Sequence, residues 1–357
     1  RCILASGAPM ADDYLKAVRF ERPDRIPMTF HINDACWQHY PQDWLFDLMA
    51  GHPVLFPGFT RPSGRYEPRF AAVARRDEPF TDDWGCVWHT SEDGITGVVT
   101  EHPLSSWDAF DSYEPPDPSR CTGIGPIDWA ATERAVARAK AEGKTAIGGL
   151  RHGHTFLQLS DIRGYENLMY DMADEEPRLW ALIEMVEEFN AGIVERFIEI
   201  GVDVVTYPED LGMQSGPMLS PEYFRTYIKP SYQRLMKPAR DAGRVVHMHS
   251  DGDIRALVDD IIEGGVQVIT LQDLVNGIDW IADRFAGKTC VELDIDRQAV
   301  TPTGTPEEID SLIRREVEAL GSRAGGLMMI YGLYPGIPAA NVEAVMDAME
   351  RYAFHFS

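Results

Sequence analysis

Residues 244–252 read Arg-Val-Val-His-Met-His-Ser-Asp-Gly, so a short β-branched run passes directly into polar side chains. The run predicts a buried strand over 244–249. Six further runs of this kind occur along the chain, over 25–30, 145–150, 203–207, 266–271, 289–293 and 327–331. Helical patterns accompany them, over 12–20 and near 175–200, 220–242, 253–264, 277–285, 305–320 and 339–353. Strands that alternate with helices are typical of a parallel sheet built from βα units.

The absence of a linker favours one α/β domain over residues 1–357, folded as a (β/α)8 TIM barrel. A Rossmann sheet is the alternative, but no GxGxxG motif follows any of the predicted strands. Residues 52–126 interrupt the alternation and are rich in Pro, Gly and Trp, with a predicted hairpin over 84–99. We expect them to form an inserted lid over one end of the barrel.

The chain carries 57 acidic and 33 basic residues, a formal net charge of −24. Such a surface repels nucleic acids and anionic membranes, so we expect neither as a partner. No window approaches the length of apolar sequence that a membrane span needs. The five cysteines are scattered without a CxxC pair, which favours a reducing cytoplasm and argues against a disulfide framework and a thiolate-rich metal site. The oligomeric state is left open.

Polar side chains follow the predicted strands directly, at the edge where a (β/α)8 barrel assembles its active site. They are His31, Asn33, Arg151, His152, His154, Glu209, Asp210, His249, Asp251, Gln272, Asp273, Asp294, Asp296, Tyr331 and Tyr334. If these segments were ordinary surface loops, so many His and carboxylate residues directly after apolar strands would not be expected. We therefore expect the functional site at this edge of the barrel.

The strand over 244–249 offers the sharpest local feature. Because alternate residues of a strand share a face, His247, His249 and Asp251 lie on one side of it. An imidazole and a carboxylate two residues apart can reach one divalent ion, and Gly252 permits a sharp turn beside them. A third ligand must come from another strand, and Glu209 is the nearest source. A buried, hydrogen-bonded His pair is the alternative interpretation.

Several stretches of the chain resemble the uroporphyrinogen decarboxylase superfamily, in the same order and spacing from about residue 12 to the C-terminus. They are Glu21–Pro27, Glu209–Gln214, Gly216–Pro221, His249–Gly252, Asp294–Gln298, Gly304–Glu308, Gly336–Pro338 and Asn341–Val342. The fold of that superfamily is a (β/α)8 barrel, which agrees with the strand pattern.

The resemblance implies one of two chemistries. True decarboxylases of the superfamily bind the acidic side chains of a porphyrinogen with an Arg-rich segment after the first strand. They also carry a His in the loop after the last strand. Here His31–Cys36 contains no Arg, and Leu333 and Tyr334 stand where that His would be. The comparison therefore favours the other branch, the cobalamin-dependent methyltransferases.

Members of that branch that methylate coenzyme M bind zinc through a His-x-Cys pair and a further Cys after the last strand. His249 matches the His of that motif, but Asp251 replaces the first Cys, and the second Cys is missing. A His and carboxylate site is harder and more Lewis-acidic than a thiolate site. It suits the polarisation of an oxygen leaving group, as in the demethylation of a methyl ether.

We therefore expect a methyltransferase that takes a methyl group from a small donor, such as an aromatic methyl ether. The acceptor is the cobalt of a separate corrinoid protein, because the chain contains no D-x-H-x-x-G motif for cobalamin. Zinc, or another divalent metal, is expected at Glu209, His249 and Asp251. Expected catalytic residues are Asp210, Asp294 and Tyr334. Expected substrate-binding residues are His31, Asn33, Trp88, Arg151 and His154.

Two other functions are consistent with the sequence. One is a decarboxylase, a lyase acting on a small or aromatic carboxylic acid, with Arg61, Arg65 and Arg151 as candidate cationic anchors. The other is a partner protein that keeps the barrel as an inactive scaffold. The many polar strand ends argue against the scaffold.

Overall fold

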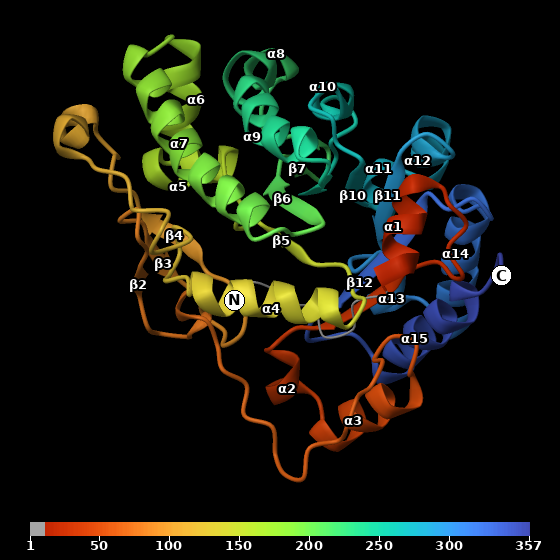
Figure 1. Cartoon of the computed structure of the whole chain (residues 1–357). Coiled ribbons are helices and arrows are strands. Elements are labelled where there is room, and N and C mark those ends of the chain that lie inside the picture. Colours follow the sequence, from red (N-terminus) through yellow and green to blue (C-terminus); the bar gives the residue numbers. More distant parts are fainter. Residues whose placement is uncertain (1–10) are drawn as a thin grey trace.

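The computed structural model describes residues 11–357, and Cys2 lies outside them. Its central sheet is parallel and has the order β1-β12-β11-β10-β9-β6-β5. The strands are β1 (Met28–Ile32), β5 (Ile147–Gly149), β6 (Val204–Asp210), β9 (Val245–Asp251), β10 (Val268–Gln272), β11 (Cys290–Asp294) and β12 (Leu327–Leu333). Because the first strand pairs with the last, the sheet curls as in a TIM barrel (Figure 1). The predicted barrel fold is confirmed, and the strand order is not that of a Rossmann sheet.

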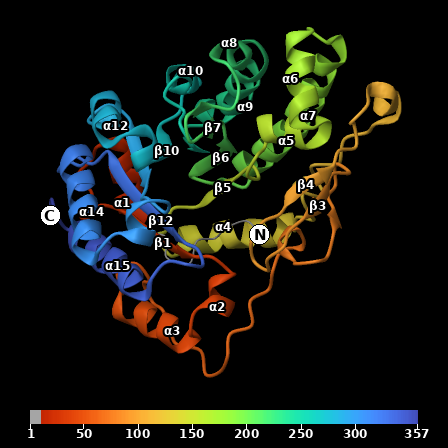
Figure 2. The ribbon, with the colours of Figure 1, turned by 180° about the vertical axis from the view of Figure 1, so that it is seen from behind.

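The segment between β1 and β5 carries a small antiparallel sheet instead of another barrel strand. Its strands are β2 (Phe80–Thr81), β3 (Val87–His89) and β4 (Val98–Glu101). Val87 pairs with Glu101 and His89 with Val98, which confirms the predicted hairpin. In Figures 1 and 2 this sheet lies on the far side of the molecule from α14 and α15. The action of residues 52–126 as a lid stays a prediction.

Helices surround the curled sheet (Figure 2). Those that the sequence pattern predicted are α1 (Ala11–Arg19), α7 (Pro177–Glu199), α8 (Pro221–Tyr223), α9 (Lys229–Asp241), α10 (Val258–Glu263), α12 (Ile278–Phe285), α14 (Pro306–Leu320) and α15 (Ala339–Ala353). The pattern missed α2 (Cys36–His39), α3 (Gln42–Gly51), α4 (Trp129–Ala141), α5 (Phe156–Arg163), α6 (Tyr165–Ala173), α11 (Asp273–Asn276) and α13 (Val300–Thr303). Within residues 11–357, no helix has both the length and the apolar character that crossing a bilayer requires.

Local signals explain where α14 begins. Thr305 accepts a hydrogen bond from the backbone N–H of Glu308, and the Glu308 carboxylate accepts one from the N–H of Thr305. This capping box satisfies two donors that the first turn would otherwise leave free, and Pro306 supplies a backbone angle suited to the first turn. The buried face of α14 then packs against α15.

A buried polar layer crosses the barrel interior near its amino end. The hydroxyl of Tyr14, on α1, lies 2.8 Å from Nδ1 of His247. On the other side of the ring, Nε2 of His247 lies 2.7 Å from Thr270 Oγ1 and 3.3 Å from Glu292 Oε2. The side chains come from α1, β9, β10 and β11, so the layer ties the first helix to the sheet. Such a layer is costly to bury unless each member is hydrogen-bonded, as it is here.

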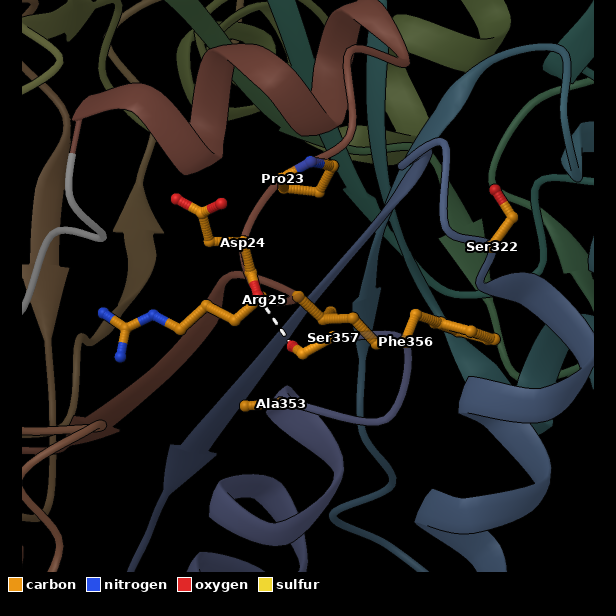
Figure 3. Close-up of a pocket in the computed structure, with 8 residues that line it drawn as sticks. Pro23, Asp24, Arg25, Ser322, Ala353, Phe356 and Ser357 are labelled. Atoms are coloured by element: carbon orange, nitrogen blue, oxygen red, sulfur yellow. Dashed lines mark hydrogen bonds between the residues drawn. The ribbon is translucent and has the colours of Figure 1, made fainter.

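The segment before β1 contacts the C-terminal residues (Figure 3). The backbone N–H of Ile26 donates to the carbonyl of Ala353, and the hydroxyl of Ser357 donates to the carbonyl of Asp24 at 2.7 Å. A cavity of about 10 Å³ lies among these residues. It lies at the amino ends of the strands, whereas barrel enzymes place their active sites at the carboxyl ends.

The turn after β9 gives a test of this architecture. Gly252 has a φ of +79°, and a Cβ there would overlap the backbone of Gly212. We expect Gly252→Ala to lower the free energy of unfolding by about 3 kcal/mol, from strain and overlap together. Gly243 also has a positive φ, but open space surrounds it, so Gly243→Ala should cost only about 1 kcal/mol. Urea denaturation measures both, and equal losses would contradict the close approach of the two backbones.

Candidate functional site

The carboxyl ends of β6 and β9 lie side by side in parallel register. His249 pairs with Pro208, and Asp251 pairs with Asp210. Paired residues of neighbouring parallel strands point to the same side of the sheet. Asp210, His249 and Asp251 therefore share the inner face at the mouth of the barrel.

His152, from the segment after β5, completes a cluster with Asp210 and His249. Its Nε2 lies 3.1 Å from Asp210 Oδ1, and Nε2 of His249 lies 3.8 Å from the same oxygen. Ligand atoms of the three residues all lie within 4.8 Å of one another. Two imidazole nitrogens and one carboxylate oxygen suit zinc and related divalent ions. The cluster could therefore hold one metal ion.

Asp251 lies beside this cluster as a further oxygen donor. Its Oδ1 lies 3.4 Å from Nε2 of His249, and its backbone N–H donates to Asp210 Oδ1 at 3.2 Å. Oδ1 of Asp251 is also buried and accepts no hydrogen bond from the described residues. A buried carboxylate oxygen without a donor is unusual and needs an explanation. A bound cation would supply one.

The cluster's electrostatics favour the metal-binding protonation states of His249 and Asp210, but not that of His152. Burial lowers the pKa of His249 from its ordinary value, and the Asp251 carboxylate offsets only part of that change. Burial alone would raise the pKa of Asp210, but the hydrogen bond and charge of His152 bring it below its ordinary value. For His152, burial opposes protonation, yet the Asp210 carboxylate outweighs burial and raises its pKa. Metal binding needs a neutral imidazole and an ionised carboxylate.

Glu209 does not reach this cluster. It precedes Asp210 on β6, so its side chain points to the outer face, where Ser250 is its partner in the register. Its carboxylate is fully buried and accepts hydrogen bonds from three backbone N–H groups at the start of α5, and from the hydroxyl of Tyr232. The expected metal ligand is thus a cap of a helix N-terminus, and the oxygen that faces His249 comes from Asp210.

Asp294, at the end of β11, lies on the other side of the mouth with Arg297 and Tyr334. Arg297 donates from Nη2 to Asp294 Oδ2, and Nη2 also lies 3.6 Å from Asp251 Oδ2. The guanidinium carbon lies 5.5 Å from the centre of the Tyr334 ring, which is 40% exposed. Burial raises the pKa of Asp294 to about 8, against the opposing charge of Arg297. Asp294 therefore holds a proton near neutral pH.

Two of the expected substrate-binding residues lie at the end of β1. His31 pairs with Gly332 of β12 and is exposed, so it lies at the mouth. Partial desolvation among the neighbouring strand ends lowers the pKa of His31 from its ordinary value, although the Asp34 carboxylate opposes this change. The side-chain oxygen of Asn33 accepts from the N–H of Ala35 at 2.9 Å, so that oxygen is occupied in the turn before α2.

The other three expected substrate-binding residues lie away from the His152 cluster. Trp88 is buried on β3 and donates to Asp82 at 2.8 Å. Arg151 lies over the Trp88 ring and pairs with Asp161 at 3.1 Å, which joins the antiparallel sheet to the barrel. His154 is 1% exposed, and burial lowers its pKa to about 3. These contacts stabilise the fold, and a role of the three residues in substrate binding stays a prediction.

Two residues of the mouth had no role in the predicted site, although His152 was among the polar residues expected at this edge. Its neighbours Arg151 and His154 were chosen as substrate-binding residues. Strand alternation could not show which way His152 points, because β5 ends at Gly149. The signal available was its position among polar residues directly after a strand. Arg297 was missed because a lone Arg in a loop carries no pattern, although it follows Asp294 within the Asp294–Gln298 motif.

Comparison with known proteins places the chain in a family. The model of that family, "Uroporphyrinogen decarboxylase (URO-D)", matches residues 82–352. Uroporphyrinogen decarboxylase of Thermus thermophilus is 29% identical over 186 residues, 50% of each chain. That of Danio rerio is 24% identical over 246 residues, 64% of this chain and 63% of the relative. The chain thus spans about half to two thirds of the length of these curated relatives.

A solved structure agrees with the fold. A "methyltransferase from Methanosarcina mazei" superposes with a TM-score of 0.65 at 15% identity, covering 96% of this chain and 98% of that one. At this identity the likeness establishes the barrel architecture alone. The family is shown by the match of its model over residues 82–352, which covers most of the sheet. The chain belongs to the uroporphyrinogen decarboxylase family.

Proposed function

We propose that this chain is a methyltransferase that removes the methyl group of a small methyl ether. The acceptor is the cobalt(I) of a corrinoid carried by a separate protein. The observation that carries the proposal is the cluster of His152, Asp210 and His249 at the mouth of the barrel, with the buried Oδ1 of Asp251, which accepts no hydrogen bond from the described residues, beside it. A set of nitrogen and oxygen ligands suits a leaving oxygen better than a thiol acceptor.

The residues of the cluster fit a zinc ion or another divalent metal. His152, Asp210 and His249 would hold it, with Asp251 as the further donor. Bound there, the metal would act as a Lewis acid toward an oxygen atom of the donor. Glu209 is left out of this ligand set because three backbone N–H groups and Tyr232 occupy its carboxylate.

The described cysteines do not offer a thiolate for such a site. Cys36, Cys86, Cys121 and Cys290 are all free and buried. Cys36 approaches the last strand, with its thiol donating to the carbonyl of Leu333 at 3.2 Å. Burial raises the pKa of the Cys36 thiol to about 12, so it is protonated at neutral pH. A thiolate is the form that binds metal, so this side chain is no replacement for the missing Cys.

The proposed reaction needs one proton for the leaving oxygen. The bond between that oxygen and the methyl carbon breaks, a bond between the carbon and cobalt forms, and the oxygen takes up the proton. Asp294, with its pKa raised to about 8, can hold and deliver that proton at the mouth. Arg297 then stabilises the Asp294 carboxylate that remains, and Tyr334 covers the Arg297 guanidinium.

A decarboxylase remains the alternative, because the curated relatives are decarboxylases. The three cationic anchors considered for it are engaged elsewhere. Arg61 pairs with Asp43 and Asp47, on α3. Arg65 lies 3.7 Å from Glu67, and Arg151 is held by Asp161 and Gly153. These contacts, and the absence of Arg from His31–Cys36, favour methyl transfer over decarboxylation of a polyacidic porphyrinogen.

The ligand set can be tested by metal content. We expect zinc-loaded protein to lose zinc affinity at least about tenfold in His152→Ala, Asp210→Asn or His249→Ala, because each removes a ligand. Glu209→Gln should keep its zinc but lower the free energy of unfolding by about 1–3 kcal/mol, since it weakens buried charge-assisted hydrogen bonds. His89→Ala, an exposed histidine on β3, is the control. Elemental analysis after dialysis measures the result, and loss of zinc only in Glu209→Gln would contradict the assignment.

The pH dependence of metal affinity gives a second test. The raised pKa of His152 means that this ring carries a proton to higher pH than an ordinary histidine, and a metal must displace it. Zinc affinity should therefore fall as pH falls through that raised pKa, by up to about tenfold per pH unit for one displaced proton. Titration calorimetry in buffers of different ionisation enthalpy counts the protons released. His152→Ala should release fewer, and an equal number would show that another group titrates.

Activity is tested with cobalt(I) cobalamin. Zinc-loaded protein mixed with a panel of methyl ethers and methylamines should form methylcobalamin, followed by its absorption spectrum. Methyl ethers should react in preference to methylamines, because an oxygen leaving group gains most from the polarising site. Asp294→Asn should lower the rate about 100-fold, as removal of a general acid does. Failure across the panel, with release of carbon dioxide from a carboxylic acid, would establish the decarboxylase instead.

A further inference from the structure

The turn that follows Asp251 is held by side chains from the end of β10 and from α11. Oε1 of Gln272 accepts a hydrogen bond from the backbone N–H of Gly252 at 3.0 Å. Nδ2 of Asn276 donates to the carbonyl of Gly252 at 3.0 Å, and its Oδ1 accepts from the N–H of Ile254 at 3.2 Å. Both peptide groups that flank Gly252 are therefore held by side chains of the neighbouring strand and helix.

Asn276 has the burial and the hydrogen bonds of a rigid contact. It is 1% exposed, and Gln272 is also buried. Besides the carbonyl of Gly252, Nδ2 of Asn276 donates to the carbonyl of Gln272 at 2.9 Å. The amide oxygen and the amide nitrogen thus both bond to backbone groups, which favours one orientation of the side chain.

The backbone of Asp251 itself is held from the side of β6. Its N–H donates to Oδ1 of Asp210 at 3.2 Å. The hydroxyl of Ser250 donates to the carbonyl of Asp251 at 3.1 Å and accepts from the N–H of Leu211 at 2.9 Å. Asp251 therefore has hydrogen-bonded peptide groups on both sides, and only its side-chain torsions are left to place its carboxylate.

That carboxylate lies between the metal-ligand cluster and Arg297. Its Oδ1 lies 3.4 Å from Nε2 of His249 and accepts no hydrogen bond from the described residues, and its Oδ2 lies 3.6 Å from Nη2 of Arg297. Because no hydrogen bond holds Oδ1, its distance from the cluster depends on the backbone that carries the side chain. A displacement of the turn at Gly252 would change that distance directly.

We propose that Asn276, together with Gln272, is a positioning residue of the metal site, which holds the turn at Gly252 so that Asp251 can supply an oxygen ligand. Groups that hydrogen-bond behind metal ligands orient them, and their removal weakens metal binding by roughly 10–100-fold. The inference rests on the proposed function, because it concerns the metal site of that function.

A contribution to stability alone is the alternative, and Asn341 offers a contact of that kind. Asn341, on α15, is 4% exposed, and its Nδ2 donates to the carbonyls of Thr301 and Gly304, each at 2.9 Å. Neither carbonyl belongs to a residue of the metal-ligand cluster. Asn341→Ala is therefore the matched control, because it removes the same kind of buried contact outside the site.

The test is a double-mutant cycle on zinc affinity, measured by calorimetry on the full chain without corrinoid or methyl donor. We expect Asn276→Ala to weaken zinc binding at least about tenfold, and Asp251→Ala by a similar factor. The double variant should bind zinc about as weakly as Asp251→Ala alone, because Asn276 acts through Asp251. Two independent roles would instead multiply the two factors.

Further variants separate positioning from a loss of stability. Gln272→Met removes the acceptor of the Gly252 N–H and should weaken zinc binding about three- to tenfold, as the loss of one hydrogen bond predicts. It enters the same cycle with Asp251→Ala, which keeps the proposal testable if Asn276→Ala fails to fold. Asn341→Ala should lower the urea midpoint of unfolding as Asn276→Ala does, yet leave zinc affinity unchanged.

The outcomes separate this inference from the proposed reaction. If Asn276→Ala and Gln272→Met bind zinc as tightly as the unmodified chain, or keep their full effect on the Asp251→Ala background, the positioning role is wrong. Unchanged zinc affinity in Asp251→Ala would overturn it too, while loss of zinc in His152→Ala would still support the cluster. The expected cycle, without methylcobalamin from any donor, would support the positioning role and contradict methyl transfer. If the unmodified chain binds no zinc, the metal site and this inference fail together.

Discussion

Strands β6 and β9 run in parallel register with Asp210 opposite Asp251, and this pairing determines which side chains enter the barrel mouth. Strand alternation turns Asp210, His249 and Asp251 inward. The same alternation turns Glu209 outward, where it binds the first N–H groups of α5. One residue of register therefore separates a ligand position from a helix cap. The close approach of Gly252 to Gly212 holds the two strand ends together just beyond this point.

The mouth that results has more carboxylates than cations. Asp251 and Asp294 lie beside Arg297, Asp210 lies beside His152 and His249, and burial makes each uncompensated charge costly. Protonation of Asp294 removes part of this cost, because burial raises the pKa of its carboxyl group to about 8. A divalent cation between His152 and His249 would compensate the remaining negative charge. A bound metal ion and a bound proton are therefore two ways of compensating the same excess of negative charge.

The sequence predicted the barrel more completely than the site. Alternating apolar runs mark buried strands wherever the core is built, so every predicted strand has its counterpart in the sheet. His249 and Asp251 followed from alternation along one strand. Their partner did not, because His152 lies beyond the end of β5, where no periodicity fixes a direction. Glu209 was predicted as the third metal ligand because it was the nearest carboxylate on another strand. The pairing of β6 with β9 shows instead that the side chain of its neighbour Asp210 points into the barrel.

The central claim is that His152, Asp210 and His249 bind one divalent ion through nitrogen and oxygen atoms. X-ray absorption at the zinc edge of the zinc-loaded chain tests this most directly, because it reports the atoms bound to the metal. The account predicts two imidazole nitrogens and one or two carboxylate oxygens at about 2.0–2.2 Å. It also predicts that His152→Ala removes one imidazole from the spectrum. Sulfur at about 2.3 Å, or zinc without imidazole ligands, would contradict it.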